Sequence, residues 1–132
     1  MSVPWTTKRY MDEVYTAGIG ERLCRSDGRT DEDPKKNYGT GGLLSNKKYM
    51  LSLTFNAPKE AFEDRIQYLF RGRSVDDLFF HIHANFRFFA MKTLPTFACH
   101  DVMKNPCIQQ DVQRLRRHID QNFSEFKSIK EV

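Results

Sequence analysis

The sequence predicts an α/β protein built on parallel strands, and three of its features indicate this class. The run Tyr49–Phe55 carries no charged residue, as expected for a strand that is covered on both faces. A second apolar stretch, residues 96–100, predicts another short strand. An amphipathic helix is predicted near each end of the sequence, so helices and strands alternate as they do in parallel α/β sheets.

The first predicted helix spans about residues 4–17. Pro4 is favourable at the first helical position, Ser2 is a candidate cap, and Gly18 supplies a stop. The apolar face of this helix would consist of Trp5, Met11, Val14 and Tyr15.

Residues 18–46 are predicted to form one long loop, because turn-forming sequences recur along them. These are Ser26–Arg29, Asp33–Pro34 and Tyr38–Gly42. A loop of this length is uncommon in a compact domain and is usually functional or disordered.

The rest of the chain predicts two strands and two further helical regions. A strand over about residues 48–55 is followed by a short helix within 58–71 and by an irregular or partly helical segment, rich in phenylalanine, over 78–91. After the second strand, Asn105–Pro106 predicts the start of the last helix. Its apolar positions are Ile108, Val112, Leu115, Ile119, Phe123 and Phe126. Two parallel strands are few for a sheet, which usually has about four to six, so parts of the sheet are expected to be missing.

Composition limits the class of protein further. A chain of 132 residues with net charge +4 is expected to be one domain that tolerates anionic ligands, and this mild charge is no nucleic-acid signature. Cys24, Cys99 and Cys107 are odd in number and lack the CxxC spacing, which argues against a disulfide framework and a thiolate zinc site. With no apolar run of about 18 residues and no signal peptide, no membrane span and a cytoplasmic location are expected.

The end of the first strand is the main candidate site. In open α/β sheets, ligands bind just outside the carboxyl ends of the strands, which places Thr54, Phe55, Asn56 and Ala57 where a cofactor would lie. An ordinary turn at a strand end is the alternative. Tyr38 is a second candidate, because a phenol can stack on a ring and the glycines that follow it let the backbone approach closely. A flexible surface turn is the alternative there.

Other side-chain groups give weaker signals. His81 and His83 would share a face on a strand, but no further residue with ligand spacing completes a metal site, and His83 fits a core or substrate-pocket position better. The sequence Cys99-His100-Asp101 resembles a catalytic triad in composition only, because neighbouring residues on a strand point to opposite faces. The basic run of Arg114, Arg116, Arg117 and His118 is expected to be a solvated face, with anion contact as the alternative.

Several long stretches resemble the bacterial "modulator of drug activity B" proteins, which are flavodoxin-like NAD(P)H:quinone oxidoreductases that carry FAD. The matching segments, in order, are residues 3–6 with Lys8, Tyr10, Asp12 and Val14; 26–30; 36–43; 47–58; 60–62; and 94–97. Phe55 stands where the family tends to have tryptophan. The resemblance covers the carboxyl-terminal portion of the family pattern, so it implies a partial flavodoxin-like domain over 1–132. This is a doubly wound parallel sheet that lacks the first strands and the phosphate-binding loop.

The resemblance also implies a function. Tyr38 and the segment Thr54, Phe55, Asn56 and Ala57 would contact the flavin, which is expected to be FAD rather than FMN. The implied reaction is two-electron reduction of a quinone by hydride transfer from NAD(P)H through flavin, in a homodimer and without a catalytic nucleophile or metal. One alternative is an inactive truncated remnant or interaction module without flavin. Another is a small basic nucleic-acid binder that uses the last helix, although no recognised motif supports it.

Overall fold

The computed structural model describes residues 2–123, and these residues divide into two compact units. Unit 1 contains the described residues up to Tyr49 together with Phe79–Thr93, and unit 2 contains Met50–Leu78 together with the described residues from Leu94 onward. Helices and parallel strand pairs occur in both units, which confirms the predicted α/β class.

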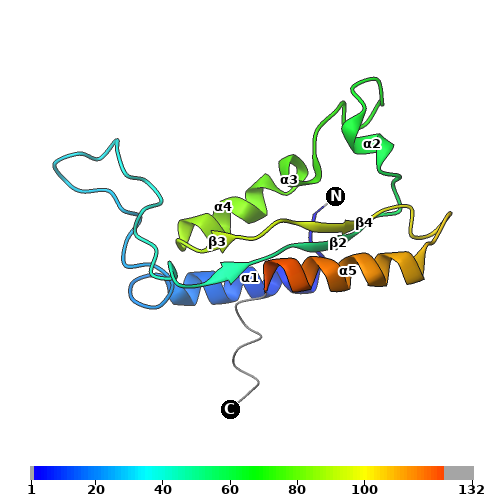
Figure 1. Cartoon of the computed structure of the whole chain (residues 1–132). Coiled ribbons are helices and arrows are strands. Elements are labelled where there is room, and N and C mark those ends of the chain that lie inside the picture. Colours follow the sequence, from blue (N-terminus) through cyan, green and yellow to red (C-terminus); the bar gives the residue numbers. More distant parts are fainter. Residues whose placement is uncertain (1, 124–132) are drawn as a thin grey trace, which may run out of the picture. The chain divides into compact units, whose positions relative to one another are not determined.

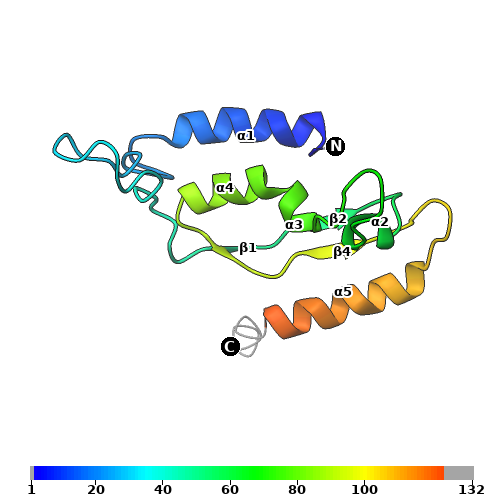
Figure 2. The same ribbon diagram turned by 90° about the horizontal axis from the view of Figure 1, so that it is seen from above.

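Unit 1 contains two helices and one short strand pair. Its elements are α1 (Trp5–Gly18), β1 (Lys48–Tyr49), α4 (Phe80–Phe88) and β3 (Lys92–Thr93), and β1 pairs with β3 in parallel. Helices α1 and α4 lie side by side, as Figure 2 shows, and the Tyr15 ring meets the ring of Phe89 edge-on with centroids 4.7 Å apart.

The predicted limits of α1 are confirmed to within about a residue, but its predicted face is only partly right. Pro4 precedes the helix instead of opening it, and Ser2 does not cap it, because its hydroxyl lies 3.3 Å from Nε2 of His81. Met11 is buried as predicted, whereas Trp5 is 73% exposed. Trp5 is the first residue of the helix, so its side chain lies beyond the turns that pack on α4.

The phenylalanine-rich segment is more regular than predicted, because most of it forms the helix α4. Its flanking residues Phe79 and Phe89 and its own Ile82 are among the buried residues of unit 1, which confirms the prediction that this segment packs in a core. The helix also separates the two histidines. His81 is exposed and His83 is buried, because residues two apart on a helix point in nearly opposite directions.

His83 belongs to a polar cluster inside unit 1. The Thr93 hydroxyl donates a hydrogen bond to the Tyr49 oxygen (2.8 Å), and the Tyr49 hydroxyl lies 2.7 Å from Nδ1 of His83. The Tyr49 ring also stacks on Phe86, with centroids 4.3 Å apart. The buried side chains of Tyr49 and His83 thus have hydrogen-bonding partners, as buried polar groups generally require, and exposed Thr93 extends this chain of contacts.

Unit 2 contains the second strand pair and the remaining helices. Its elements are β2 (Ser52–Thr54), α2 (Glu60–Glu63), α3 (Val75–Leu78), β4 (Phe97–Cys99) and α5 (Ile108–Asn122). Strands β2 and β4 run in parallel, with Ser52, Leu53 and Thr54 opposite Phe97, Ala98 and Cys99. Figure 1 shows this pair with α2 beyond one of its ends.

The single strand predicted over 48–55 is in fact two short strands, β1 and β2. Tyr49 pairs with Thr93, and Ser52 pairs with Phe97. The segment from Thr93 to Phe97 is one residue longer than the segment from Tyr49 to Ser52, so one continuous register cannot be kept. Pro95 lies in that interval and has no N–H group to donate to a ladder. Strand β3 was not predicted, because two residues ahead of Leu94–Pro95 give no periodic signal.

The prediction that the first strand is covered on both faces is wrong for β2. Ser52 and Thr54 are exposed and Leu53 is only half-buried. Among the described residues β2 has a single strand neighbour, β4, so no other described strand pairs with its second edge. The buried core of unit 2 is instead aromatic and includes Phe62, Phe70 and Phe97.

Helix α5 packs on β4 through two side chains of the basic run. Arg114 donates to the carbonyl oxygen of Ala98 (3.1 Å), and His118 donates from Nε2 to that of Pro95 (2.8 Å). Both also contact the ring of Phe97. Arg114, Arg116 and Arg117 are exposed, so the expected solvated face holds for the three arginines, whereas His118 is half-buried.

The last helix also differs from its prediction at its start. It begins at Ile108 rather than at Asn105–Pro106, and its described apolar positions are half-buried or exposed, with Ile108 70% exposed. Phe126 lies outside the described residues. Within the part of the chain that the structure describes, no helix combines the length and apolar character needed to cross a membrane.

Candidate functional site

The segment Thr54–Ala57 lies where β2 ends, as the sequence predicts. Thr54 is the last residue of the strand and is exposed, Asn56 is exposed in a bend, and Phe55 and Ala57 are half-buried. Because β2 and β4 are parallel, their carboxyl ends meet at the same edge of the pair. Hydrogen-bonding side chains therefore reach solvent at the position where parallel α/β folds bind ligands.

The residues after β4 hold this loop through three backbone hydrogen bonds. The Phe55 N–H donates to the Cys99 carbonyl (2.9 Å), the Asp101 N–H to that of Ala57 (3.1 Å) and the Val102 N–H to that of Phe55 (3.1 Å). Asp101 has a φ of +55°, a conformation that aspartate tolerates better than most residues. The loop Thr54–Ala57 is thus fastened at both ends to the carboxyl end of β4.

An aromatic cluster lies beneath the loop. The Phe55 ring is stacked on the imidazole of His100, with centroids 5.5 Å apart and planes at 17°. Phe62 meets His100 edge-on at 5.3 Å and Phe55 at 5.0 Å, and Phe70 stacks on Phe62 at 4.1 Å. These contacts fix the direction in which the backbone of the loop presents its neighbours Thr54 and Asn56.

His100 titrates below the usual range for histidine. Burial is the main cause that lowers its pKa from the ordinary 6.5, and the Ala57 carbonyl partly opposes this effect. The ring is therefore neutral near pH 7. Because the pKa is lower in the folded than in the unfolded state, the associated stability is present above about pH 6.5 and is lost as the pH falls through the folded-state pKa.

Among the cavities that open beside β4, two are lined by His100. The first, of about 210 Å³, lies between β4 and helices α2 and α3, and the second, of about 740 Å³, extends toward α5. Thr96, Ala98 and His100 line both. The Oγ1 of Thr96 and the Nδ1 of His100 are buried and have no hydrogen-bond partner among the described residues.

Tyr38, the other predicted site residue, lies in unit 1 on the long loop. Its ring is 70% exposed, meets Phe88 at 5.8 Å, and has the guanidinium of Arg29 over its face at 5.4 Å. The side chain is thus accessible to a ligand and at the same time restrained by two neighbours.

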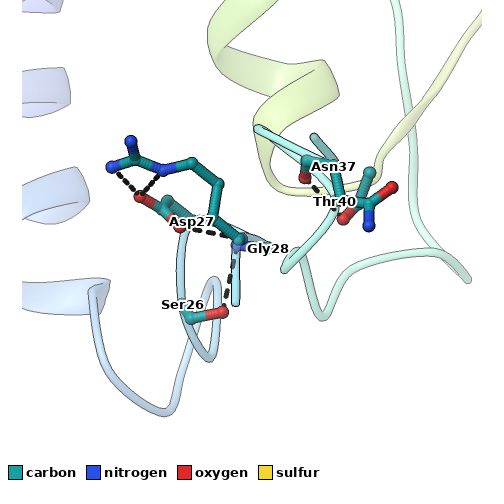
Figure 3. A network of polar contacts seen from close by, with 6 residues as sticks. Ser26, Asp27, Gly28, Asn37 and Thr40 are labelled. Atoms are coloured by element: carbon teal, nitrogen blue, oxygen red, sulfur yellow. Dashed lines mark hydrogen bonds and ion pairs between the residues drawn. The ribbon is translucent and has the colours of Figure 1, made fainter. Parts of the chain in front are cut away.

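The loop that carries Tyr38 is ordered by a network of polar contacts, which Figure 3 shows. Arg29 forms an ion pair with Asp27 (2.7 Å), which lowers the pKa of that carboxyl, and the Gly28 N–H donates to Oγ of Ser26 (3.0 Å). On the facing segment, the Thr40 hydroxyl donates to the Asn37 carbonyl (2.7 Å). The Gly39 N–H joins the two segments by donating to the Asp27 carbonyl (2.6 Å). The long connection is therefore a structured loop.

The backbone at Gly41 and Gly42 packs closely against other segments of unit 1. A Cβ at Gly41 would collide with the backbone of Ser26, and one at Gly42 would collide with the backbone of Phe89 and Ala90. Buried Cys24 lies in this region, and its backbone forms isolated β-bridges with Ile19 and Gly42. Only glycine fits at these two positions.

The remaining candidates are structural in the described residues. Cys99 ends β4, and burial raises the pKa of its thiol, which does not favour a nucleophile. No group of three or more metal-ligating side chains occurs within residues 2–123. Sequence reasoning treated His100 as an ordinary strand residue and gave Arg29 no role. The position of His100 could have indicated a role at the site, because it directly follows the end of the strand, two residues after Ala98.

Comparison with known proteins places these units in a family. The flavodoxin-like fold family matches residues 1–123. The chain is 47% identical over 123 residues to the NADPH:quinone oxidoreductase MdaB of Haemophilus influenzae, across 93% of this chain and 63% of the relative. It is 46% identical over 123 residues to an uncharacterized protein of Schizosaccharomyces pombe, across 93% of this chain and 62% of the relative.

Both findings agree with the sequence analysis. The predicted resemblance to the modulator of drug activity B proteins is confirmed, and so is the predicted flavodoxin-like fold class. The chain spans about three fifths of the length of the curated relatives it matches. On the match over residues 1–123, the chain belongs to the flavodoxin-like fold family.

Proposed function

We propose that this chain functions in an FAD-dependent NAD(P)H:quinone oxidoreductase and supplies part of its flavin site. The observation that carries the proposal is the exposed, fastened loop Thr54–Ala57 at the carboxyl end of a parallel strand pair. The identity of 47% with an NADPH:quinone oxidoreductase over 93% of the chain supports the same class of reaction. A homodimer and the use of FAD rather than FMN belong to the proposal.

The chemistry of the exposed groups fits a flavin. Thr54 carries a hydroxyl and Asn56 an amide, and both can donate hydrogen bonds to the oxygens and nitrogens of a flavin ring. Tyr38 provides a flat, exposed aromatic face with a guanidinium beside it. Tyr38 belongs to unit 1, and Thr54 and Asn56 belong to unit 2.

Bound flavin would supply the hydride chemistry between a nicotinamide and a quinone. The residues of the chain would bind and orient. Hydrogen-bond donors at Thr54, Asn56 and the loop backbone would lie where negative charge collects on a reduced flavin ring. Donors that are already in place stabilise such charge best, because they need not move during the reaction. Tyr38 would cover the ring and the substrate beside it, which excludes water.

Titration of the 132-residue chain with FAD is the experiment that tests the proposal. We expect saturable binding at micromolar concentrations, followed by flavin fluorescence, with the protein eluting as a folded dimer in size-exclusion chromatography. Asn56→Ala should weaken binding by about 5- to 30-fold, since it removes a hydrogen bond to the ligand. Absence of binding, or elution as an aggregate, would contradict a flavin site in this chain and favour the remnant or interaction module.

Replacement of Tyr38 by phenylalanine separates stacking from hydrogen bonding. If the hydroxyl contacts the quinone, NADPH-dependent quinone turnover should fall by about 5- to 10-fold, while flavin affinity and the unfolding midpoint stay unchanged. Tyr10→Phe is the matched control, because Tyr10 is 63% exposed on α1 in the same unit. Unchanged steady-state kinetics in Tyr38→Phe would remove this hydroxyl from the site.

A further inference from the structure

We propose that His100 is a positioning residue for the loop Thr54–Ala57, which it holds by stacking its imidazole on Phe55. The role in positioning the loop follows from the structure alone, whereas its consequence for flavin rests on the proposed function. His100 itself is not proposed to touch flavin or substrate.

Stacking is the first observation. The two rings are nearly parallel at 17°, and Phe62, which is 1% exposed, supports both from the side. Phe55 is one residue from the exposed Thr54 and one from Asn56. The contact that holds the Phe55 ring therefore acts on the residue that lies between the two donors.

The backbone around His100 provides the second observation. Cys99 accepts a hydrogen bond from the loop, and Asp101 and Val102 donate to it, so three residues within two positions of His100 bond the loop. Asp101 keeps a positive φ, which is uncommon outside glycine and is found mainly where surrounding contacts hold it. The His100 side chain and the backbone of residues 99–102 thus both contact the loop Thr54–Ala57.

The neutral ring explains why the arrangement suits pH 7. A charged imidazolium at His100 would lie between two cavities and beside aromatic rings. Nearby charged side chains already form ion pairs with each other, namely Lys59 with Glu63 (3.3 Å) and Arg114 with Asp111 (2.6 Å). The charged side chains that line the two cavities beside His100 are Lys59 at the start of α2, Glu60 and Glu63 from α2, Asp76 from α3, Asp111 and Arg114 from α5, and Asp101 next in sequence. Protonation of His100 should therefore disturb the stack and move the loop.

Nuclear magnetic resonance tests the positioning role without any flavin. We expect the amide resonances of Phe55, Asn56 and Ala57 to shift with pH along the same curve as the His100 ring, with a midpoint below 6.5. In His100→Phe this shift should vanish while the loop resonances stay near their wild-type positions, because the stack is kept. His81→Phe, at an exposed histidine of unit 1, is the matched control and should leave the loop titration intact.

Flavin binding is the second readout. His100→Ala should weaken FAD binding by about 3- to 10-fold, the usual range for one aromatic contact, and His100→Phe should restore it to within about twofold. If His100→Ala does not fold by circular dichroism, His100→Asn takes its place.

The outcomes separate this inference from the proposed function. Loop amides that ignore the His100 titration, or a His100→Ala protein with wild-type loop resonances and flavin affinity, would overturn the positioning role. If the wild-type chain binds no flavin but the loop follows His100, the positioning role stands and the flavin proposal fails.

Discussion

Replacement of Phe62 by alanine is expected to lower the free energy of unfolding by about 3–5 kcal/mol. Phe62 is 1% exposed and touches Phe55, Phe70 and His100, so truncation removes a large buried area and leaves a cavity that these rings cannot close. Domains are typically stable by about 5–15 kcal/mol, so this loss would be a large part of the total. Urea denaturation followed by circular dichroism measures it as a fall in the midpoint at constant slope.

Tyr68→Ala is the control for this prediction. Tyr68 is also aromatic and in unit 2 but is 86% exposed, so its truncation should change the unfolding free energy by no more than about 0.5 kcal/mol. If Phe62→Ala unfolds the protein, Phe62→Leu keeps most of the volume and should show a smaller loss. Equal effects of Phe62→Ala and Tyr68→Ala would show that the aromatic cluster is not a core.

Replacement of Gly42 by alanine should destabilise unit 1 by about 3 kcal/mol or more, at the upper end of overpacking effects. The added Cβ would lie 2.6 Å from the carbonyl oxygen of Phe89 and closer still to neighbouring backbone atoms. Backbone cannot rotate away as a side chain can, and the Leu44 N–H bond to Phe89 (2.9 Å) holds the two segments together. Hydrogen exchange of amides between residues 19 and 47 would measure the loosening.

Gly20→Ala is the control for Gly42→Ala, because it introduces backbone strain without steric crowding. Gly20 has a φ of +106°, but a Cβ there would meet nothing within 4 Å, so its replacement should cost only about 1–2 kcal/mol. A Gly42→Ala protein as stable as Gly20→Ala would mean that the two segments do not approach as closely as the structure places them. In that case the restraint on Tyr38 would also be weaker.

The chain's own residues determined much of the fold before any tertiary contact was considered. The helices near residues 4–17 and 108–122 follow from spacings of three and four, and the strand near Leu53 and the one near Ala98 follow from uncharged runs. The close backbone approach at Gly41 and Gly42 was also predictable, because glycine-rich turns commonly serve that purpose. These are local properties, and local rules suffice for them.

Tertiary structure alone decided the rest. The strand over 48–55 divides because its partner segment contains one extra residue and a proline, and no pattern within 48–55 records what lies opposite. Arg114 and His118, predicted to belong to a solvated basic face, also bond the carbonyl oxygens of Ala98 and Pro95. The stack of His100 on Phe55 joins residues 45 positions apart in sequence. Spacing within a segment can place a side chain on a face, but only the packing of distant segments determines which partner that face meets.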